Sequence, residues 1–136
     1  MRPLGADLVR DVTPLLAGFD TLVTDYSSLV FDSSLVPLPV VFLAPDVHRY
    51  AAERGFYGSY RDVAGDDVAG TWEQAVAQID AVLGDPAERA RRIECARQID
   101  VRVHAFRDGG NAARVYRAIL TALADEPPSG SRKGPR

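Results

Sequence analysis

Lysine, cysteine and histidine are scarce in this chain of 136 residues, which has fifteen arginines against one lysine, one cysteine and two histidines. The lysine, Lys133, lies among the last few residues, so a folded core has no lysine for active-site chemistry. Cys95 has no partner within the chain for a disulfide, which is typical of a protein in a reducing compartment. No apolar run approaches the roughly 18 residues of a membrane-spanning helix, and the first residues do not follow the pattern of an export signal. We therefore expect a cytoplasmic protein.

Acidic and basic residues are unevenly distributed along the chain. It has 19 acidic and 16 basic residues, but residues 127–136 hold three basic residues and no acidic one. The preceding body has a net charge of −6, which argues against a surface that binds nucleic acid. Apolar residues make up 46% and charged residues 26% of the composition, as in a globular protein. We predict one folded region, residues 1–126, followed by a disordered basic tail, residues 127–136.

Two short apolar segments with a helix between them predict the centre of the fold. Residues 21–24 are mostly β-branched and apolar, and residues 39–44 form a second, continuous apolar run. Continuous runs are typical of parallel strands that helices cover on both faces. Between them, the spacing of Val30, Phe31 and Ser34 predicts a helix that two prolines end. The sequence therefore predicts a strand–helix–strand unit of an α/β fold.

Capping residues and helical spacing predict the elements that follow. Asp46 is placed to cap a helix that continues to about residue 53. Thr71 and Gln74 form a capping box for the next helix, and Trp72 is expected in the core at the head of its apolar face. Residues 56–70, which are rich in glycine, tyrosine and aspartate, predict an extended or looped connection between these two helices.

The last two predicted helices differ in character. The first begins at Pro86 and is rich in arginine, with a thin apolar stripe and a polar face that we expect to lie in solvent. The arginines of that face are Arg89, Arg91, Arg92 and Arg97. The second begins near Asn111 and has apolar residues along one face.

The number of predicted strands is too small. Two strands do not make an independently stable sheet of this kind. Either residues 1–20 and 56–70 contain strands that the pattern does not reveal, or material outside this chain completes the sheet. The sequence leaves both explanations open, and we favour the second.

The segment Thr24-Asp-Tyr-Ser-Ser28 lies where an α/β sheet binds ligands, directly after the carboxyl end of a strand. The start of the following helix has free backbone N–H groups and a partial positive charge, and the hydroxyls of Ser27 and Ser28 add donors, which together suit a phosphate group. Asp32 lies four residues after Ser28, on the same helix face. Its carboxylate would repel a phosphate but can accept hydrogen bonds from ligand hydroxyls, such as those of ribose or glycerol.

Helix capping explains the same residues without any ligand. Asp25 and Ser27 are common capping residues, and Asp32 is of a type that usually lies in solvent on a helix. Neither histidine lies in a recognisable motif. His48 fits a surface position in its helix, and His104 has no assigned role.

A few other residues have a chemical and a structural interpretation. Arg114 is a candidate for a phosphate or polymer contact, because arginine binds phosphate through two parallel hydrogen bonds, although a solvated position is favoured. Phe56 and Tyr57 are expected to pack in the protein rather than to stack on a ligand. Asp66-Asp67 has no third ligand nearby, so we predict no metal site.

Four stretches carry a more specific pattern. They are Asp20-Thr-Leu-Val-Thr-Asp-Tyr-Ser-Ser-Leu-Val-Phe-Asp32, Pro39-Val-Val-Phe-Leu-Ala-Pro-Asp46, Glu53-Arg-Gly-Phe-Tyr57 and Asp108-Gly-Gly-Asn-Ala-Ala-Arg-Val115. Together they resemble the CDP-glycerol glycerophosphotransferases, a family of teichoic-acid primases and polymerases. The resemblance covers most of residues 8–120, and the combination of Thr-Asp-Tyr-Ser-Ser with Arg-Gly-Phe-Tyr is specific to it.

The resemblance implies a GT-B arrangement of two Rossmann-like domains, of which this chain matches the final part of the C-terminal, donor-binding domain. It implies transfer of glycerol phosphate from CDP-glycerol to a hydroxyl of a polyol-phosphate polymer, with release of CMP. Carried over by position, Ser27 and Ser28 would hold the phosphates of the donor, and Asp32 would bind its hydroxyls. CDP-glycerol is then a substrate, and no tightly bound cofactor is implied.

The catalytic histidines of that family lie upstream of the matching segment, and neither His48 nor His104 corresponds to them. We therefore assign no catalytic residue to this chain and expect no transferase activity from it alone. A companion chain that supplies the N-terminal half is a further expectation. A cytoplasmic location with a peripheral contact to the inner face of the bacterial membrane is another.

Three other interpretations remain. A signalling receiver domain would use Asp25 as its phosphorylated residue, but it needs a lysine after a late strand, and Lys133 does not fit. A sugar-nucleotide glycosyltransferase of GT-B type would also place a carboxylate where Asp32 lies. A truncated, inactive product that binds a nucleotide or a partner protein is the third.

Overall fold

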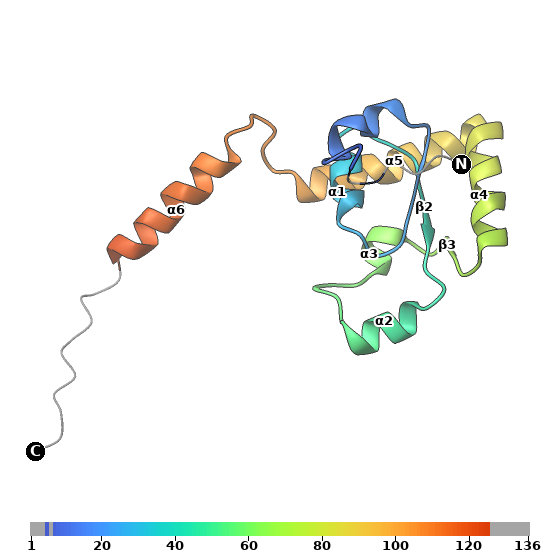
Figure 1. The fold of residues 1–136 in the computed structure, drawn as a ribbon, viewed down its shortest axis with the longest axis horizontal. Coiled ribbons are helices and arrows are strands. Elements are labelled where there is room, and N and C mark those ends of the chain that lie inside the picture. Colours follow the sequence, from blue (N-terminus) through green and yellow to red (C-terminus); the bar gives the residue numbers. More distant parts are fainter. Residues whose placement is uncertain (1–4, 6, 126–136) are drawn as a thin grey trace, which may run out of the picture. The chain divides into compact units, whose positions relative to one another are not determined.

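The computed structural model describes residue 5 and residues 7–125, and the chain divides into two units, Met1–Val103 and His104–Arg136 (Figure 1). The elements of the first unit are η1 (Thr13–Gly18), β1 (Leu22–Thr24), α1 (Leu29–Ser34), β2 (Val40–Leu43), α2 (Val47–Glu53), α3 (Arg61–Ala64), β3 (Val68–Ala69), α4 (Trp72–Gly84) and α5 (Pro86–Val103). The second unit contains α6 (Asn111–Asp125). Among these helices, none is both long enough and apolar enough to cross a membrane.

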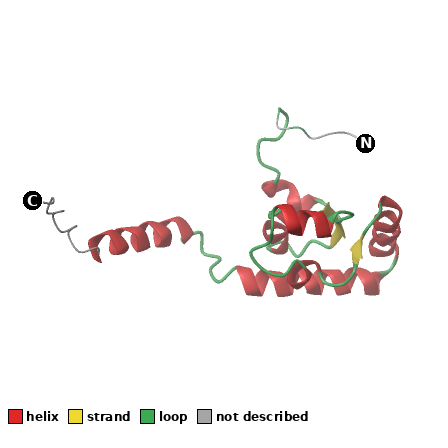
Figure 2. Ribbon diagram, turned by 90° about the horizontal axis from the view of Figure 1, so that it is seen from below, coloured by secondary structure: helices red, strands yellow, loops and turns green. Residues whose placement is uncertain are grey.

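The first unit is built on a parallel sheet of three short strands in the order β1-β2-β3. Val23 pairs with Val41, and Leu43 pairs with Ala69. The prediction of an α/β fold with parallel strands is confirmed, and Figure 2 shows the strands lying among helices. Residues 56–70, predicted as an extended or looped connection, contain the short helix α3, which was not predicted, and the strand β3. A missed strand therefore accounts for part of the shortage, because a strand of two residues is too short to show alternation.

Alternate residues of the strands point to two different apolar layers. On one face, Val40 and Phe42 of β2 pack in a cluster with Val30 of α1 and Ile99 of α5. On the other face, Val41 of β2 lies in a cluster that includes Val82 of α4. Because side chains alternate along a strand, the continuous apolar run of β2 serves both layers at once. This arrangement fixes β1 and β2 side by side, with both carboxyl ends at one edge of the sheet.

The helix after β2 begins as expected, but not for the expected reason. Asp46 makes no capping hydrogen bond to α2. Its carboxylate instead accepts hydrogen bonds from the Tyr26 hydroxyl, at 2.8 Å, and from the Arg49 guanidinium, at 2.7 Å. The prediction of Asp46 as a cap is therefore wrong, and Asp46 links α2 to the segment that follows β1. Gly55 ends this region with φ of +73°, a conformation that favours glycine.

The predicted capping box of α4 forms, but the side chain predicted to lie in the core at the head of this helix is exposed. The Gln74 N–H donates to Thr71 Oγ1, as predicted, whereas the Gln74 side chain accepts from the N–H of Gly70. Ala75 and Val82 are fully buried on the sheet. Trp72 is 65% exposed, so its prediction as a core residue is wrong.

The arginine-rich helix α5 does not present a simple solvated face. The Arg92 side chain is 6% exposed and donates to the backbone carbonyl of Val40, at 2.8 Å. Arg91 is bound to Glu88 and Asp67, both through charge-assisted hydrogen bonds. The expectation of solvated arginines is wrong for Arg92 and holds for Arg97, whose pairing with Glu94 spans 3.7 Å at the surface.

The second unit consists, over its described residues, of a short turn and α6. The helix begins at Asn111, as predicted. Its large apolar side chains are all about half exposed or more, and they are Val115, Tyr116, Ile119, Leu120 and Leu123. Arg114 forms two hydrogen bonds to the carboxylate of Asp108 and lies 4.0 Å from the ring centre of Phe106. The predicted disordered tail, residues 127–136, lies outside the described residues.

Candidate functional site

A cavity of about 620 Å³ lies at the edge of the sheet where β1 and β2 end. Its lining residues come from the segment after β1, from α1, α2 and α3, from the loop before α3, and from the end of α5. The lining residues include Asp25, Tyr26, Ser27, Ser28, Tyr50, Phe56, Tyr57, Tyr60, Asp62 and Arg102. Ligands of open α/β sheets bind outside the carboxyl ends of the strands, and this cavity has that position.

Ser27 and Ser28 both line the cavity, at the start of α1. The N–H of Leu29 donates to Ser27 Oγ, at 3.2 Å, so Ser27 has the capping role that the sequence left open. A hydroxyl that accepts one hydrogen bond still has its own proton to donate, so capping does not prevent Ser27 from binding an anion. Ser28 makes no capping hydrogen bond through its side chain and is exposed.

The start of α1 offers fewer backbone donors than the sequence suggests. The N–H groups of Val30 and Phe31 donate to the carbonyls of Ser27 and Ser28, in tight i to i−3 bonds. The N–H of Leu29 is also used, by Ser27 Oγ. The helix has only six residues, so its dipole is small. The donors at the start of α1 that these bonds do not use are the two serine hydroxyls and the backbone N–H groups of Ser27 and Ser28.

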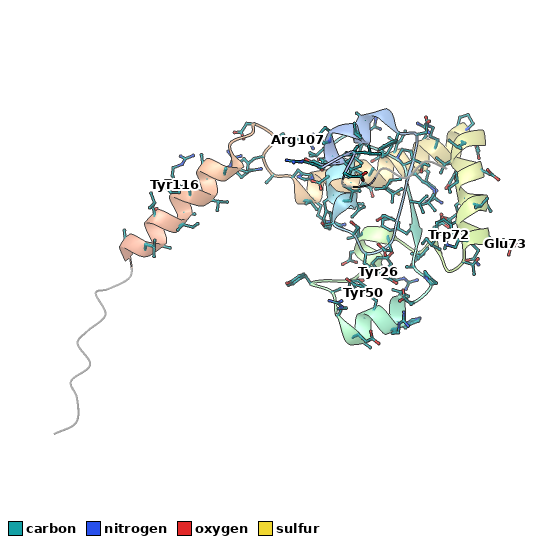
Figure 3. The ribbon with its side chains drawn as sticks, viewed as in Figure 1. Tyr26, Tyr50, Trp72, Glu73, Arg107 and Tyr116 are labelled. Atoms are coloured by element: carbon teal, nitrogen blue, oxygen red, sulfur yellow. The ribbon has the colours of Figure 1, made fainter. Side chains whose placement is uncertain are left out.

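Four aromatic rings form one side of the cavity. The ring centres of Tyr26 and Tyr50 are 3.9 Å apart, with planes nearly parallel, and Figure 3 shows the two side chains meeting beside α2. Phe56 stacks on Tyr50 and on Tyr60, with both pairs of ring centres 5.3 Å apart. The prediction that Phe56 packs within the protein is confirmed. We call Tyr26, Tyr50, Phe56 and Tyr60 the aromatic cluster, and it ties α2 and the loop before α3 to the segment after β1.

Two tyrosine hydroxyls of the aromatic cluster hold the polypeptide around the cavity. The Tyr60 hydroxyl donates to the backbone carbonyl of Asp25, at 3.0 Å, across 35 residues of sequence. Burial and the nearby charge of Asp25 raise the pKa of Tyr60 to about 12. Burial and the hydrogen bond to Asp46 also raise the pKa of Tyr26. Both hydroxyls therefore remain protonated donors at neutral pH, and they act as positioning groups rather than as acids or bases.

The charges around the cavity do not favour an anion by themselves. Asp25, Asp62 and Arg102 are its charged lining residues, which gives a net charge of −1. Arg102 also donates to the backbone carbonyl of Asp62. The cavity thus supplies hydroxyl donors and apolar walls, while positive charge for a phosphate must come from elsewhere.

The remaining predicted site residues are distributed differently. Asp32 lies in α1, one turn beyond Ser28, and is half-buried, but it does not line the cavity. Its proposed contact with ligand hydroxyls stays a prediction. His48 is exposed in α2, as expected for a surface residue. The sequence interpretation missed Tyr26, Tyr50 and Tyr60 as parts of the site. The aromatic run around Gly55 includes Tyr50 and Tyr60 but not Tyr26, so it was a signal for only part of the cluster.

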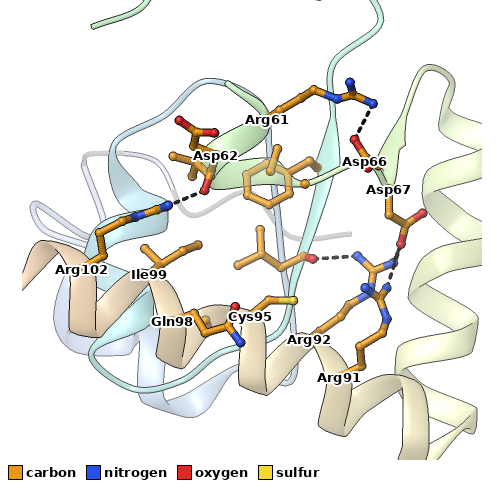
Figure 4. A pocket seen from close by; sticks show the side chains of 16 residues that line it. Arg61, Asp62, Asp66, Asp67, Arg91, Arg92, Cys95, Gln98, Ile99 and Arg102 are labelled. Carbon is orange, nitrogen blue, oxygen red and sulfur yellow. Dashed lines mark hydrogen bonds and ion pairs between the residues drawn. The ribbon is translucent and has the colours of Figure 1, made fainter. Parts of the chain in front are cut away.

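A second, smaller cavity of about 190 Å³ lies between α3, the segment before β3 and α5 (Figure 4). Its arginines are already bound. Arg61 pairs with Asp66, while Arg91 and Arg92 both bind Asp67. The two adjacent aspartates thus serve different arginines, and Arg102, which also lines this cavity, donates to the backbone carbonyl of Asp62. Within the described part of the chain, no three histidine, cysteine or acidic side chains are grouped as they would be to hold a metal ion.

Comparisons with known proteins agree on one family. Residues 5–121 match the family described as CDP-Glycerol:Poly(glycerophosphate) glycerophosphotransferase. Among curated proteins, a teichoic acid poly(ribitol-phosphate) polymerase of Bacillus spizizenii is 34% identical over 87% of this chain and 18% of its own length. A teichoic acid ribitol-phosphate primase of the same organism is 31% identical over 88% of this chain and 31% of its own length. A teichoic acid glycerol-phosphate transferase of Staphylococcus aureus is 31% identical over 82% of this chain and 28% of its own length.

These matches cover most of this chain but only a small part of each relative. This chain is covered almost completely, whereas it spans less than a third of the length of each of these three relatives. No solved structure matches the chain.

Proposed function

The chain belongs to the CDP-glycerol:poly(glycerophosphate) glycerophosphotransferase family, and we propose that it forms the part of such an enzyme that binds the nucleotide donor. The donor is CDP-glycerol or the corresponding CDP-ribitol, since the relatives are named for both polyols. The acceptor is a hydroxyl of a polyol-phosphate polymer or its primer. The whole reaction needs groups that this chain does not hold, so its own contribution is binding and orientation.

One observation carries the proposal: the cavity at the carboxyl ends of β1 and β2 has Ser27 and Ser28 at its edge and an aromatic side beside them. Its volume of about 620 Å³ lies within the range of small-molecule and cofactor sites. Hydroxyl groups suit phosphate oxygens, and an aromatic wall suits a nucleobase. A Rossmann-like donor domain of a GT-B enzyme has its nucleotide site at this edge, so we propose that architecture for the complete protein.

Ser27 and Ser28 bind the phosphates of the donor in this proposal, and the carboxylate of Asp32 accepts hydrogen bonds from the hydroxyls of the polyol. The net charge of −1 around the cavity implies weak binding by the chain alone. Further positive groups come from the region of the protein that corresponds to the rest of the longer relatives, or from a companion chain. We accordingly propose that the chain by itself does not extend a polymer.

Calorimetric titration with CDP-glycerol and CDP-ribitol at millimolar concentrations tests the proposal. Hydrogen bonds to charged groups contribute about 1.5–3 kcal/mol each, so replacing Ser27→Ala and Ser28→Ala together weakens binding by about a hundredfold or more. Thr121→Ala removes an exposed hydroxyl from α6 and serves as the matched control, with no expected change. Soluble, folded protein that binds neither donor would instead support the inactive remnant.

A sugar-nucleotide glycosyltransferase is the second candidate, because its donor would use the same sheet edge. The same titration with UDP-glucose separates the two. Binding of the polyol donors in preference to the sugar donor supports the family assignment at the level of the substrate.

A peripheral membrane contact is a further proposal, and α6 is the element that favours it. Residues 104–136 hold six basic and three acidic residues, in contrast with the acidic remainder of the chain. The exposed apolar residues of α6 give that basic segment an amphipathic helix, which suits the surface of an anionic membrane.

A further inference from the structure

Tyr57 lines the same cavity but differs from its aromatic neighbours. It is fully exposed, with a relative accessibility of 115%. It makes none of the ring contacts that join Tyr26, Tyr50, Phe56 and Tyr60 to one another. The prediction that Tyr57 packs within the protein is wrong. A large apolar ring left in water at the edge of an apolar cavity is available for a ligand.

The loop that carries Tyr57 explains how consecutive aromatic residues have opposite positions. Phe56 is held between Tyr50 and Tyr60, so its side chain points into the aromatic cluster. Gly55 and Gly58 lie on either side of the pair, and Gly55 has a positive φ of +73°. A side chain at either glycine would meet nothing within 4 Å, so the loop is not crowded. Phe56 therefore anchors the loop, while Tyr57 is free to turn its ring over the cavity.

We propose that Tyr57 is the stacking surface for the nucleobase of the donor, and this inference rests on the proposed function. The cytosine ring offers a flat π-face, whereas the glycerol or ribitol end of the donor offers none. The aromatic cluster has its own rings largely stacked on one another, so Tyr57 supplies the free face. Ser27 and Ser28 line the same cavity and receive the phosphates that are attached to the nucleoside.

Stacking makes a specific demand on the residue at position 57. Stacking of a base needs the aromatic ring but not the hydroxyl of the tyrosine. Binding is therefore retained with phenylalanine at this position and weakened with alanine. By the usual strength of base–aromatic stacking, Tyr57→Ala weakens binding about fivefold to a hundredfold. Tyr57→Phe stays within about twofold of the unchanged protein. Because Tyr57 is fully exposed, neither substitution disturbs packing.

The experiment is a titration of the full chain, its Y57A and its Y57F variants with CDP-glycerol and with CMP. Tyr116→Ala, which removes an exposed tyrosine of α6, is the matched control. The expected result is an equal loss of affinity for CDP-glycerol and CMP in Y57A, retention in Y57F, and no change in Y116A. Thermal melting of each variant verifies that the fold is unchanged.

Two results would overturn the inference while leaving the proposed function intact. The first is unchanged CDP-glycerol binding by Y57A while the double serine variant loses it. The second is a loss in Y57A that affects CDP-glycerol and spares CMP, which would place the ring on the polyol. Absence of CDP-glycerol binding by the unchanged chain would overturn the proposed function and the inference together.

Discussion

Arg92 joins three parts of the first unit through one buried guanidinium. It donates to Val40 of β2, to Asp67 before β3, and to Glu88 one turn earlier in α5. Without this guanidinium the Val40 carbonyl loses a buried hydrogen-bond donor, and Glu88 and Asp67 keep Arg91 as their cationic partner. We expect Arg92→Ala to lower the free energy of unfolding by about 1–3 kcal/mol, measured by urea denaturation.

The control for that substitution lies on the same helix. Arg97 pairs with Glu94 at 3.7 Å, and both side chains are more than half exposed. Surface pairs of this kind contribute about 0–1 kcal/mol, so Arg97→Ala leaves the urea midpoint nearly unchanged. Equal effects of the two substitutions would contradict a structural role for the buried guanidinium.

Glu88 makes the same contacts sensitive to pH. Hydrogen bonds from Arg91, and then from Arg92, lower its pKa from 4.5 to about 2. Because the pKa is lower in the folded state, the stabilisation is complete above about pH 4.5 and is lost as the pH falls towards 2. We expect the free energy of unfolding to decrease across this interval, and Glu88→Gln to reduce that decrease. A pH dependence identical in the two proteins would contradict the assignment.

Elements with long or repeated patterns were predictable from the sequence, and those defined by one or two residues were not. Apolar patterns in the sequence itself are sufficient to predict the strand over residues 21–24 and the helices α4 and α6. The strand β3 has two residues and gains its definition from pairing with β2, which no local pattern encodes.

The candidate site was predictable to a similar degree. Ser27 and Ser28 follow from their position after a strand, because that position is a property of the α/β fold. The aromatic cluster does not follow in this way, since Tyr26, Tyr50 and Tyr60 come together only through tertiary packing. The exposure of Tyr57 beside a half-buried Phe56 is likewise a consequence of the turn at Gly55.

The exposed apolar face of α6 predicts binding to membranes. Its exposed apolar face within a basic segment is expected to bind vesicles that contain anionic lipid, and to bind neutral vesicles less. Ile119→Glu with Leu120→Glu places charges on that face and abolishes co-sedimentation. Asn111→Ala lies at the start of the helix and is the control. Equal co-sedimentation of the double variant and the unchanged chain would contradict the membrane contact.

At the scale of the whole molecule, the chain has a unit that contains the candidate cavity and a separate helical unit. Every residue that lines the larger cavity lies between Asp25 and Val103, within the first unit. We therefore expect a chain ending after residue 103 to fold and to bind CDP-glycerol with unchanged affinity. Loss of binding on this truncation, in a protein that still melts cooperatively, would mean that the second unit takes part in the site.

In the proposed function, the cavity beyond β1 and β2 binds the nucleotide donor. Backbone amide NMR during titration with CDP-glycerol tests it most directly, because it locates the ligand without any substitution. We expect the largest shift changes on residues 25–28 and 55–60, with little change around Arg91 and Cys95 of the smaller cavity. Shift changes centred on the smaller cavity, or none at millimolar donor, would contradict it.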